Sequence, residues 1–184
     1  MIALVIVTVC ILLSLLWQLY RWSILSSPSS SQILSLIEEK LSQLGLCKEE
    51  TLLVDLGSGI GSTLGFFASR GWKKTRGIEG FFPIWLVSIF IRFSLQRKYS
   101  LKWGDYRLES LETEQKKVMF AYISPWAMRE MEQWLEEKKP SFCWLITHTF
   151  ALPTKKPDLV LWANDLYRSP VYFYKGYSWD QPID

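Results

Sequence analysis

The stretch LVDLGSGIGS, residues 53–62, decides the fold. It begins with a short apolar run that ends in Asp55, and glycines then alternate with other residues at Gly57, Gly59 and Gly61. Glycines between a buried strand and the helix that follows it lie at the carboxyl edge of a parallel sheet, where doubly wound folds bind ligands. There the bare backbone lets a ligand approach closely, and the helix supplies free N–H groups.

A carboxylate ends the next expected strand. Glu79 lies in TRGIEG (75–80), 22 residues after Gly57, and a carboxylate at this place is suited to accept the two ribose hydroxyls of a nucleoside. The pattern is not the dinucleotide fingerprint, because Ser62 stands where its third glycine would fall, and the Lys-Ser/Thr pair of a P-loop is absent from the loop. A tight turn without a ligand is the alternative. The combined glycines and acids favour a nucleoside-bearing cofactor.

Segments typical of helices and strands alternate on both sides of this loop. We expect helices at residues 32–46, 62–70, 83–98 and 124–138. We expect strands at residues 51–56, 75–80, 99–105, 117–123 and 141–150, and a closing antiparallel pair at 158–165 and 169–179. This order predicts an α/β domain with a mostly parallel sheet and helices on both faces. The very apolar helix that starts at Pro83 is expected to be buried in the core, with a lipid-facing entrance as the alternative.

The first 22 residues have the pattern of a membrane span. Residues 1–17 carry no charge, and the apolar run continues to Tyr20, about the length that crosses a bilayer core. Arg21 follows the run and no basic residue precedes it, which puts the rest of the chain in the cytoplasm. A cleaved signal peptide is the alternative, but it would need a charged leading region. We expect a single-pass membrane protein with an anchor at 1–22, a linker at 23–31 and the folded domain at 32–184.

Charge and cysteine content narrow the possible partners. The formal net charge of +3 indicates no particular class of partner, and we expect no nucleic-acid partner. Between Arg70 and Arg107 the chain nevertheless has nine basic and two acidic residues, which could present a positive face to phosphate or anionic lipid, although a solvated helix face is the simpler interpretation. The three cysteines share no close spacing and the chain has one histidine, so neither a metal site nor a disulfide framework is expected.

Two motifs carry a family resemblance. VDLGSGIG (54–61) and GIEG (77–80) resemble motif I and the acidic post-strand motif of the class I S-adenosylmethionine-dependent methyltransferases. More narrowly, residues 53–95 are similar to the small membrane-associated lysine methyltransferases of the adenine nucleotide translocase and the ATP synthase c subunit, and to their bacterial relatives. Those proteins also pair a hydrophobic N-terminal segment with a motif-I strand, a G-x-E strand end and a Pro-x-Trp-Leu helix start.

The resemblance implies a Rossmann-like class I methyltransferase fold, S-adenosylmethionine as the cofactor and no metal. It places the glycine loop along the methionine and sugar, Glu79 at the ribose, and the end of the third strand at the adenine. For Asp105, at the end of that strand, a turn-capping aspartate is the alternative. Asp55 would order the loop or meet the methionine ammonium. The implied cofactor residues are Asp55, Gly57, Ser58, Gly59, Gly61, Glu79, Asp105 and Tyr106.

The acceptor is expected where the fourth strand ends, in AYISPWAM (121–128). The candidate catalytic residues there are Tyr122, Ser124 and Trp126, whose aromatic and polar groups can orient an amine. In the alternative interpretation the segment only starts a helix, with Trp126 in its core. His148 is expected to be structural rather than a general base. The expected function is methylation of a lysine in a membrane protein at the lipid bilayer. The alternatives are a methyltransferase for a lipid, quinone or other small molecule, and a non-catalytic membrane-tethered binding module.

Overall fold

A seven-stranded sheet forms the centre of the molecule. The computed structural model describes residues 29–109 and 116–176, and the strand order is β3-β2-β1-β4-β5-β7-β6. The first five strands pair in parallel, and β7 runs antiparallel to both β5 and β6. The strands are β1 (Leu52–Leu56), β2 (Lys74–Glu79), β3 (Ser100–Trp103), β4 (Lys117–Ala121), β5 (Trp144–His148), β6 (Leu159–Trp162) and β7 (Pro170–Lys175). The expected parallel sheet with a closing antiparallel pair is confirmed.

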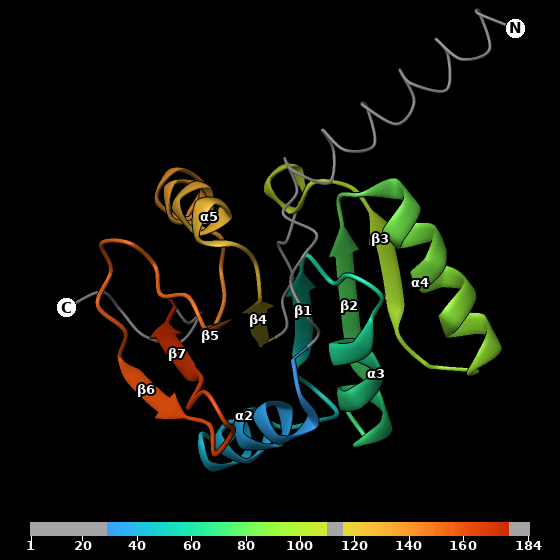
Figure 1. Cartoon of the computed structure of the whole chain (residues 1–184), viewed down its shortest axis with the longest axis horizontal. Coiled ribbons are helices and arrows are strands. Elements are labelled where there is room, and N and C mark those ends of the chain that lie inside the picture. The colour runs from blue at the N-terminus through green and yellow to red at the C-terminus, as the bar shows by residue number, and fades with distance from the viewer. Residues whose placement is uncertain (1–28, 110–115, 177–184) are drawn as a thin grey trace, which may run out of the picture.

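Helices cover both faces of this sheet (Figure 1). The helices are α2 (Ser31–Gln43), α3 (Ser62–Ser69), α4 (Phe82–Ser94), α5 (Pro125–Lys138) and the 3-10 helix η1 (Tyr106–Leu108). The apolar sides of α2 and α3 pack in one core cluster, and that of α5 packs in the other. Every residue of β1 and β4 is buried, because a parallel strand between two helical layers has no solvent-facing side.

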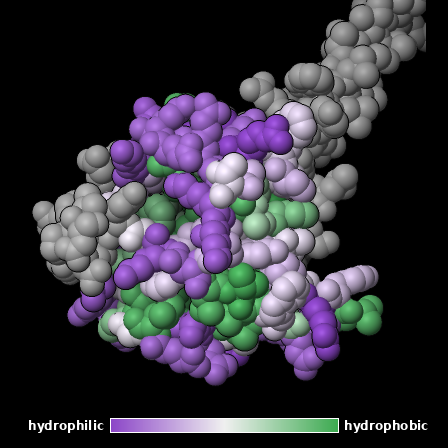
Figure 2. Space-filling model, turned by 90° about the vertical axis from the view of Figure 1, so that its left-hand side faces the viewer, coloured by the Kyte–Doolittle hydropathy of each residue, from purple (hydrophilic) through white to green (hydrophobic). Residues whose placement is uncertain are grey.

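The outer surface of α5 is polar, in keeping with one-sided packing. Figure 2 shows this helix as hydrophilic, while apolar residues gather lower on the same face, at the level of the β6–β7 hairpin. On its inner side, buried Glu132 accepts hydrogen bonds from the backbone N–H groups of Thr154 and Lys155. These bonds fasten the segment between β5 and β6 to the helix.

The predicted burial of the helix after Pro83 is wrong. In α4 only Ser88 is fully buried, whereas Phe90 is 73% exposed and Phe93 is 71% exposed. The reason is topological, because α4 lies along β2 and the edge strand β3 (Figure 1). No further layer covers its outer side among residues 29–109 and 116–176. The helix therefore presents an apolar surface to solvent.

The predicted localisation as a single-pass membrane protein is corrected. No helix within the described ranges is long and apolar enough to cross a bilayer. The longest of them, α5, has 14 residues, whereas a span needs about 20. The segment to which the anchor was assigned, residues 1–22, lies outside the described residues, as does the linker up to residue 28. The first described helix starts at Ser31, where the Ser30 hydroxyl accepts a hydrogen bond from the Ile33 N–H.

Candidate functional site

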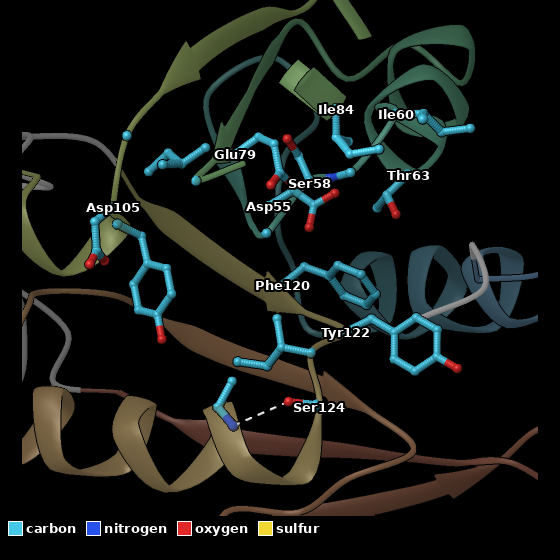
Figure 3. Close-up of a pocket in the computed structure, with 18 of the residues that line it drawn as sticks. Asp55, Ser58, Ile60, Thr63, Glu79, Ile84, Asp105, Phe120, Tyr122 and Ser124 are labelled. Atoms are coloured by element: carbon cyan, nitrogen blue, oxygen red, sulfur yellow. Dashed lines mark hydrogen bonds between the residues drawn. The ribbon is translucent and has the colours of Figure 1, made fainter. Parts of the chain in front are cut away.

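A cavity of about 290 Å³ lies at the carboxyl edge of the sheet, beyond the ends of β1, β2 and β4. Ten of the eleven residues predicted for the site line it, and only Gly61 does not. Figure 3 shows Asp55 and Glu79 side by side, with Tyr122 and Ser124 across the cavity from them. Other lining residues, which sequence reasoning did not single out, include Ser29, Thr63, Ile84, Arg107 and Glu130.

The glycine loop turns sharply because its glycines adopt left-handed backbone conformations. The φ angles are +84° at Gly57, +53° at Gly59 and +79° at Gly61, a region that is strained for other residues. At Gly61 space is also lacking, since a Cβ would lie 2.7 Å from the Tyr99 hydroxyl oxygen. At Gly59 no heavy atom lies within 4 Å of a Cβ position, so the positive φ angle, and not a lack of space, favours glycine there. The sequence interpretation, in which glycine makes room for a ligand, gives only part of the reason.

Glu79 ties this loop to the end of β2. Its Oε2 accepts a hydrogen bond of 2.8 Å from the Gly59 N–H, and its Oε1 accepts one of 2.8 Å from the Phe81 N–H. Burial raises the pKa of the carboxyl group, and the backbone hydrogen bonds oppose that rise. Each carboxylate oxygen has lone pairs for a further donor. Glu79 therefore has the geometry to accept two hydroxyl groups from a ligand in the cavity.

Asp55 adds a second acid to the same wall. Its side chain is buried, and desolvation, followed by repulsion from Glu79, raises its pKa to about 8. A hydrogen bond from Thr63 lowers that pKa only in part. Within the described residues no lysine or arginine forms a salt bridge with either acid. This wall of the cavity therefore favours a ligand with positive charge.

Asp105 has a mainly internal role at the end of β3. Its carboxylate accepts hydrogen bonds from the backbone N–H of Arg107 and from the Nε and Nη2 atoms of the same guanidinium, at 2.6–3.0 Å. Arg107 Nη1 also lies 2.5 Å from Glu130. Tyr106 packs edge-on against Trp134, with ring centroids 5.3 Å apart, and burial raises the pKa of its phenol. These contacts hold the 103–107 turn against α5.

The three residues predicted to meet the acceptor line the cavity, where Tyr122 and Ser124 are partly exposed and Trp126 is exposed. The Ser124 hydroxyl accepts a hydrogen bond from the Ala127 N–H and caps α5, as the helix-start alternative predicted. Trp126 is 76% exposed, so it is not in the helix core, and the Arg129 guanidinium lies 5.9 Å from the centre of its ring. The Tyr122 ring packs against that of His148, with centroids 4.2 Å apart. The three predicted side chains thus share one wall, and their catalytic role remains a prediction.

His148 is buried behind Tyr122, and Ser29 reaches it from the start of the described chain. His148 Nδ1 and the Ser29 hydroxyl lie 2.9 Å apart, and burial lowers the pKa of the imidazole to about 4. His148 does not line the cavity, whereas Ser29 does. The two residues are 119 positions apart in the sequence, so no local pattern predicts that Ser29 and His148 are in contact.

Gly77, in β2, allows the glycine loop to pack closely against this strand. A Cβ at this position would come within 2.6 Å of the Ser58 hydroxyl oxygen and 2.5 Å of Leu64 Cδ1. The glycine therefore lets β2 pack closely against both the loop and α3. Its place in the GIEG motif was the signal that could have identified it.

Similarity to known proteins is found in the structure and not in the sequence. The sequence matches no family model and no curated protein. The structure is similar to an RNA methyltransferase from Salinibacter ruber in complex with S-adenosyl-L-homocysteine, with a TM-score of 0.66 and 20% identity over 86% of this chain and 98% of that one.

Two further structures agree. A mutant of MtNAS in complex with S-adenosylmethionine has a TM-score of 0.62 and 14% identity over 79% of this chain and 62% of that one. The Escherichia coli protein yhhF has a TM-score of 0.61 and 11% identity over 83% of this chain and 88% of that one. At these identities the likeness concerns the fold, and the chain has the Rossmann-like fold of the class I methyltransferases.

Proposed function

We propose that the protein is an S-adenosylmethionine-dependent methyltransferase that binds its cofactor in the cavity at the carboxyl edge of the sheet. The observation that carries this proposal is Glu79, whose carboxylate holds the glycine loop through Gly59 and faces the cavity. The solved structures with S-adenosylmethionine or S-adenosyl-L-homocysteine support it, because they share the fold.

The charge of the cavity supports the same cofactor. S-adenosylmethionine carries a positive sulfonium and a positive ammonium, and Asp55 and Glu79 provide two buried acids without a salt-bridge partner among the described residues. A cation near Asp55 lowers the pKa of that carboxyl group and draws it towards the ionised form. The positive charge of a bound cofactor would thus offset part of the free-energy cost of keeping the ionised acids buried.

The residues of the chain would act mainly by positioning. The bound cofactor supplies an activated methyl group, so no protein nucleophile is required. The glycine loop and Glu79 would hold the nucleoside, while Asp55 faces the positive end of the ligand. Alignment of the acceptor with the methyl group can provide much of the rate acceleration, because it replaces a bimolecular encounter.

The proposed acceptor is a protein lysine, as the family resemblance implies. The wall formed by Tyr122, Ser124 and Trp126 offers aromatic and neutral polar groups at the opening. An aromatic wall that excludes water lowers the pKa of a lysine, which must lose its proton before it attacks. A small-molecule acceptor and a non-catalytic binding module are the other candidates.

Cofactor binding is tested first, by titration calorimetry with S-adenosylmethionine. Glu79→Ala removes a charged acceptor of two hydroxyl groups and should weaken binding by about 2–3 kcal/mol, or roughly a hundredfold. Glu136→Gln, which alters an exposed carboxyl group on α5, is the matched control and should bind like the wild type. Absence of binding by the wild type at millimolar cofactor would refute the proposal.

The acceptor is tested with radiolabelled cofactor and extracts from the host. Label in protein, recovered as methyl-lysine after acid hydrolysis, supports lysine methylation. Label in lipid or small molecules would replace that acceptor with another. Cofactor binding without transfer to any fraction would favour the non-catalytic module.

A further inference from the structure

A second concave surface lies at the opposite edge of the sheet from the cavity. It has a volume of about 850 Å³ and is formed by the amino-terminal residues of β1, β2 and β3 together with part of α4. Of the ten described residues that line it, five are cationic and none is acidic; the cationic residues are Lys73, Lys74, Arg76, Arg92 and Lys98. We call this surface the basic groove.

The cations of the basic groove are not neutralised by salt bridges. Within residues 29–109 and 116–176, no carboxylate lies within salt-bridge distance of any of the five, whereas other cations such as Lys48, Lys102 and Arg107 have partners. Fully exposed Glu49 interacts electrostatically with Lys73 but does not line the groove. Like charges gathered in a hollow focus the field and attract anions.

Two exposed aromatic rings lie on α4 near Arg92, although neither of them lines the groove. The Arg92 guanidinium lies 5.5 Å from the centre of the Phe93 ring. Phe90 lies three residues earlier on α4, and side chains at this spacing are neighbours on a helix surface. Both rings are more than two-thirds exposed, so they can contact flat groups of a ligand that extends from the groove past Arg92 onto α4.

We propose that the basic groove binds single-stranded nucleic acid. The lysines and arginines would contact successive phosphates, and Phe90 and Phe93 would stack on bases. A groove of cations flanked by aromatic faces is the combination that binds single strands without sequence preference. The hollow form favours a strand over a lipid surface, because headgroups in a flat bilayer are reached by protruding charges. No nucleic-acid partner was expected for a chain of such modest net charge. The net charge of the whole chain does not reveal that five cations are clustered in the basic groove.

The test is binding of a fluorescein-labelled 12-nucleotide oligouridine RNA to the full-length chain, followed by fluorescence anisotropy. If all five cations contact phosphates, the logarithm of the association constant should fall with the logarithm of salt at a slope of about −3.5. Binding should then weaken about a hundredfold between roughly 50 and 200 mM salt. The triple variant Lys73→Gln, Lys74→Gln, Lys98→Gln should bind more weakly and reduce the slope to about −1.4.

A second variant separates stacking from charge. Phe90→Ala with Phe93→Ala should weaken binding about tenfold while leaving the salt slope unchanged. The matched control is Lys138→Gln, Lys156→Gln, Lys175→Gln, which removes the same charge from exposed positions outside the groove and should leave binding intact. Circular dichroism confirms that each variant is folded.

Three results would overturn the proposal. These are absence of RNA binding at about 50 mM salt, equal loss of binding in the control triple variant, and binding to phosphatidylserine vesicles in place of RNA. The last result would identify the basic groove as a lipid-binding surface. Because RNA binding is measured without S-adenosylmethionine, failure of this test and failure of the proposed methyltransferase activity are separate outcomes.

Discussion

Replacing Asp55 with asparagine should remove a loss of stability that the wild type shows as pH rises above about 6.5. Asp55 is buried, and desolvation and the neighbouring Glu79 raise its pKa to about 8, from 3.8 for an ordinary aspartate. In the folded, cofactor-free protein the group therefore holds a proton at neutral pH. In the unfolded chain the same group is ionised.

The sign and size of the effect follow from this difference in protons bound. Between about pH 4 and pH 8 the folded state binds one more proton at Asp55, so the free energy of unfolding falls by about 1.4 kcal/mol per pH unit. His148 acts in the opposite direction, because burial lowers its pKa from 6.5 to about 4 and the unfolded state binds the extra proton. The two slopes offset each other between about pH 4 and 6.5. Asp55 acts without this opposition above that range.

The assay is urea denaturation at pH 6.5 and 7.5 without cofactor. The wild type should lose about 1 kcal/mol more than Asp55→Asn between these two values. Asp158→Asn, which alters an exposed carboxyl group, should behave like the wild type. The reasoning fails if the wild type gains stability over this range, or if Asp55→Asn shows the same dependence as the wild type.

Three further outcomes are expected. Gly61→Ala should destabilise the fold by about 1–3 kcal/mol in thermal or urea denaturation, because its φ is +79° and its Cβ would meet the Tyr99 hydroxyl; an unchanged stability would contradict that geometry. Phe90→Ser should change the free energy of unfolding by less than about 0.5 kcal/mol, since the ring is exposed; a loss of several kcal/mol would mean that the Phe90 ring is packed in the core. Affinity for S-adenosylmethionine should rise up to about tenfold between pH 6.5 and 7.5 as Asp55 ionises; calorimetry would show no such rise if Asp55 does not face the positive charge.

Local patterns were enough to predict the central part of the site. The glycine loop follows β1 and Glu79 is the last residue of β2, and the parallel register pairs Asp55 with Gly77. That register brings Glu79 beside the loop, 20 residues from Gly59. Because strand ends meet at one edge of a parallel sheet, positions in the sequence translated directly into positions in the cavity.

Burial and distant contacts were not predictable in the same way. The apolar composition of α4 indicated a core helix, but burial depends on whether another layer covers that side, and β3 is the edge strand. This covering is not encoded in a window of neighbouring residues. The assignment of Asp105 to a ligand had a different weakness, because its carboxylate accepts three hydrogen-bond donors from Arg107, only two residues further along the chain.

The two proposed binding surfaces are electrostatically separate. The cavity lies at the carboxyl ends of the strands and the basic groove at their amino ends, and a strand of five residues such as β1 spans about 16 Å. Salt screens exposed charges over about 8 Å at physiological ionic strength, so the cations of the groove, which are all at least partly exposed, have little influence on the acids of the cavity. A variant that removes charge from the groove should therefore leave the pH dependence of cofactor binding unchanged. Each surface can be altered while the other serves as the internal control.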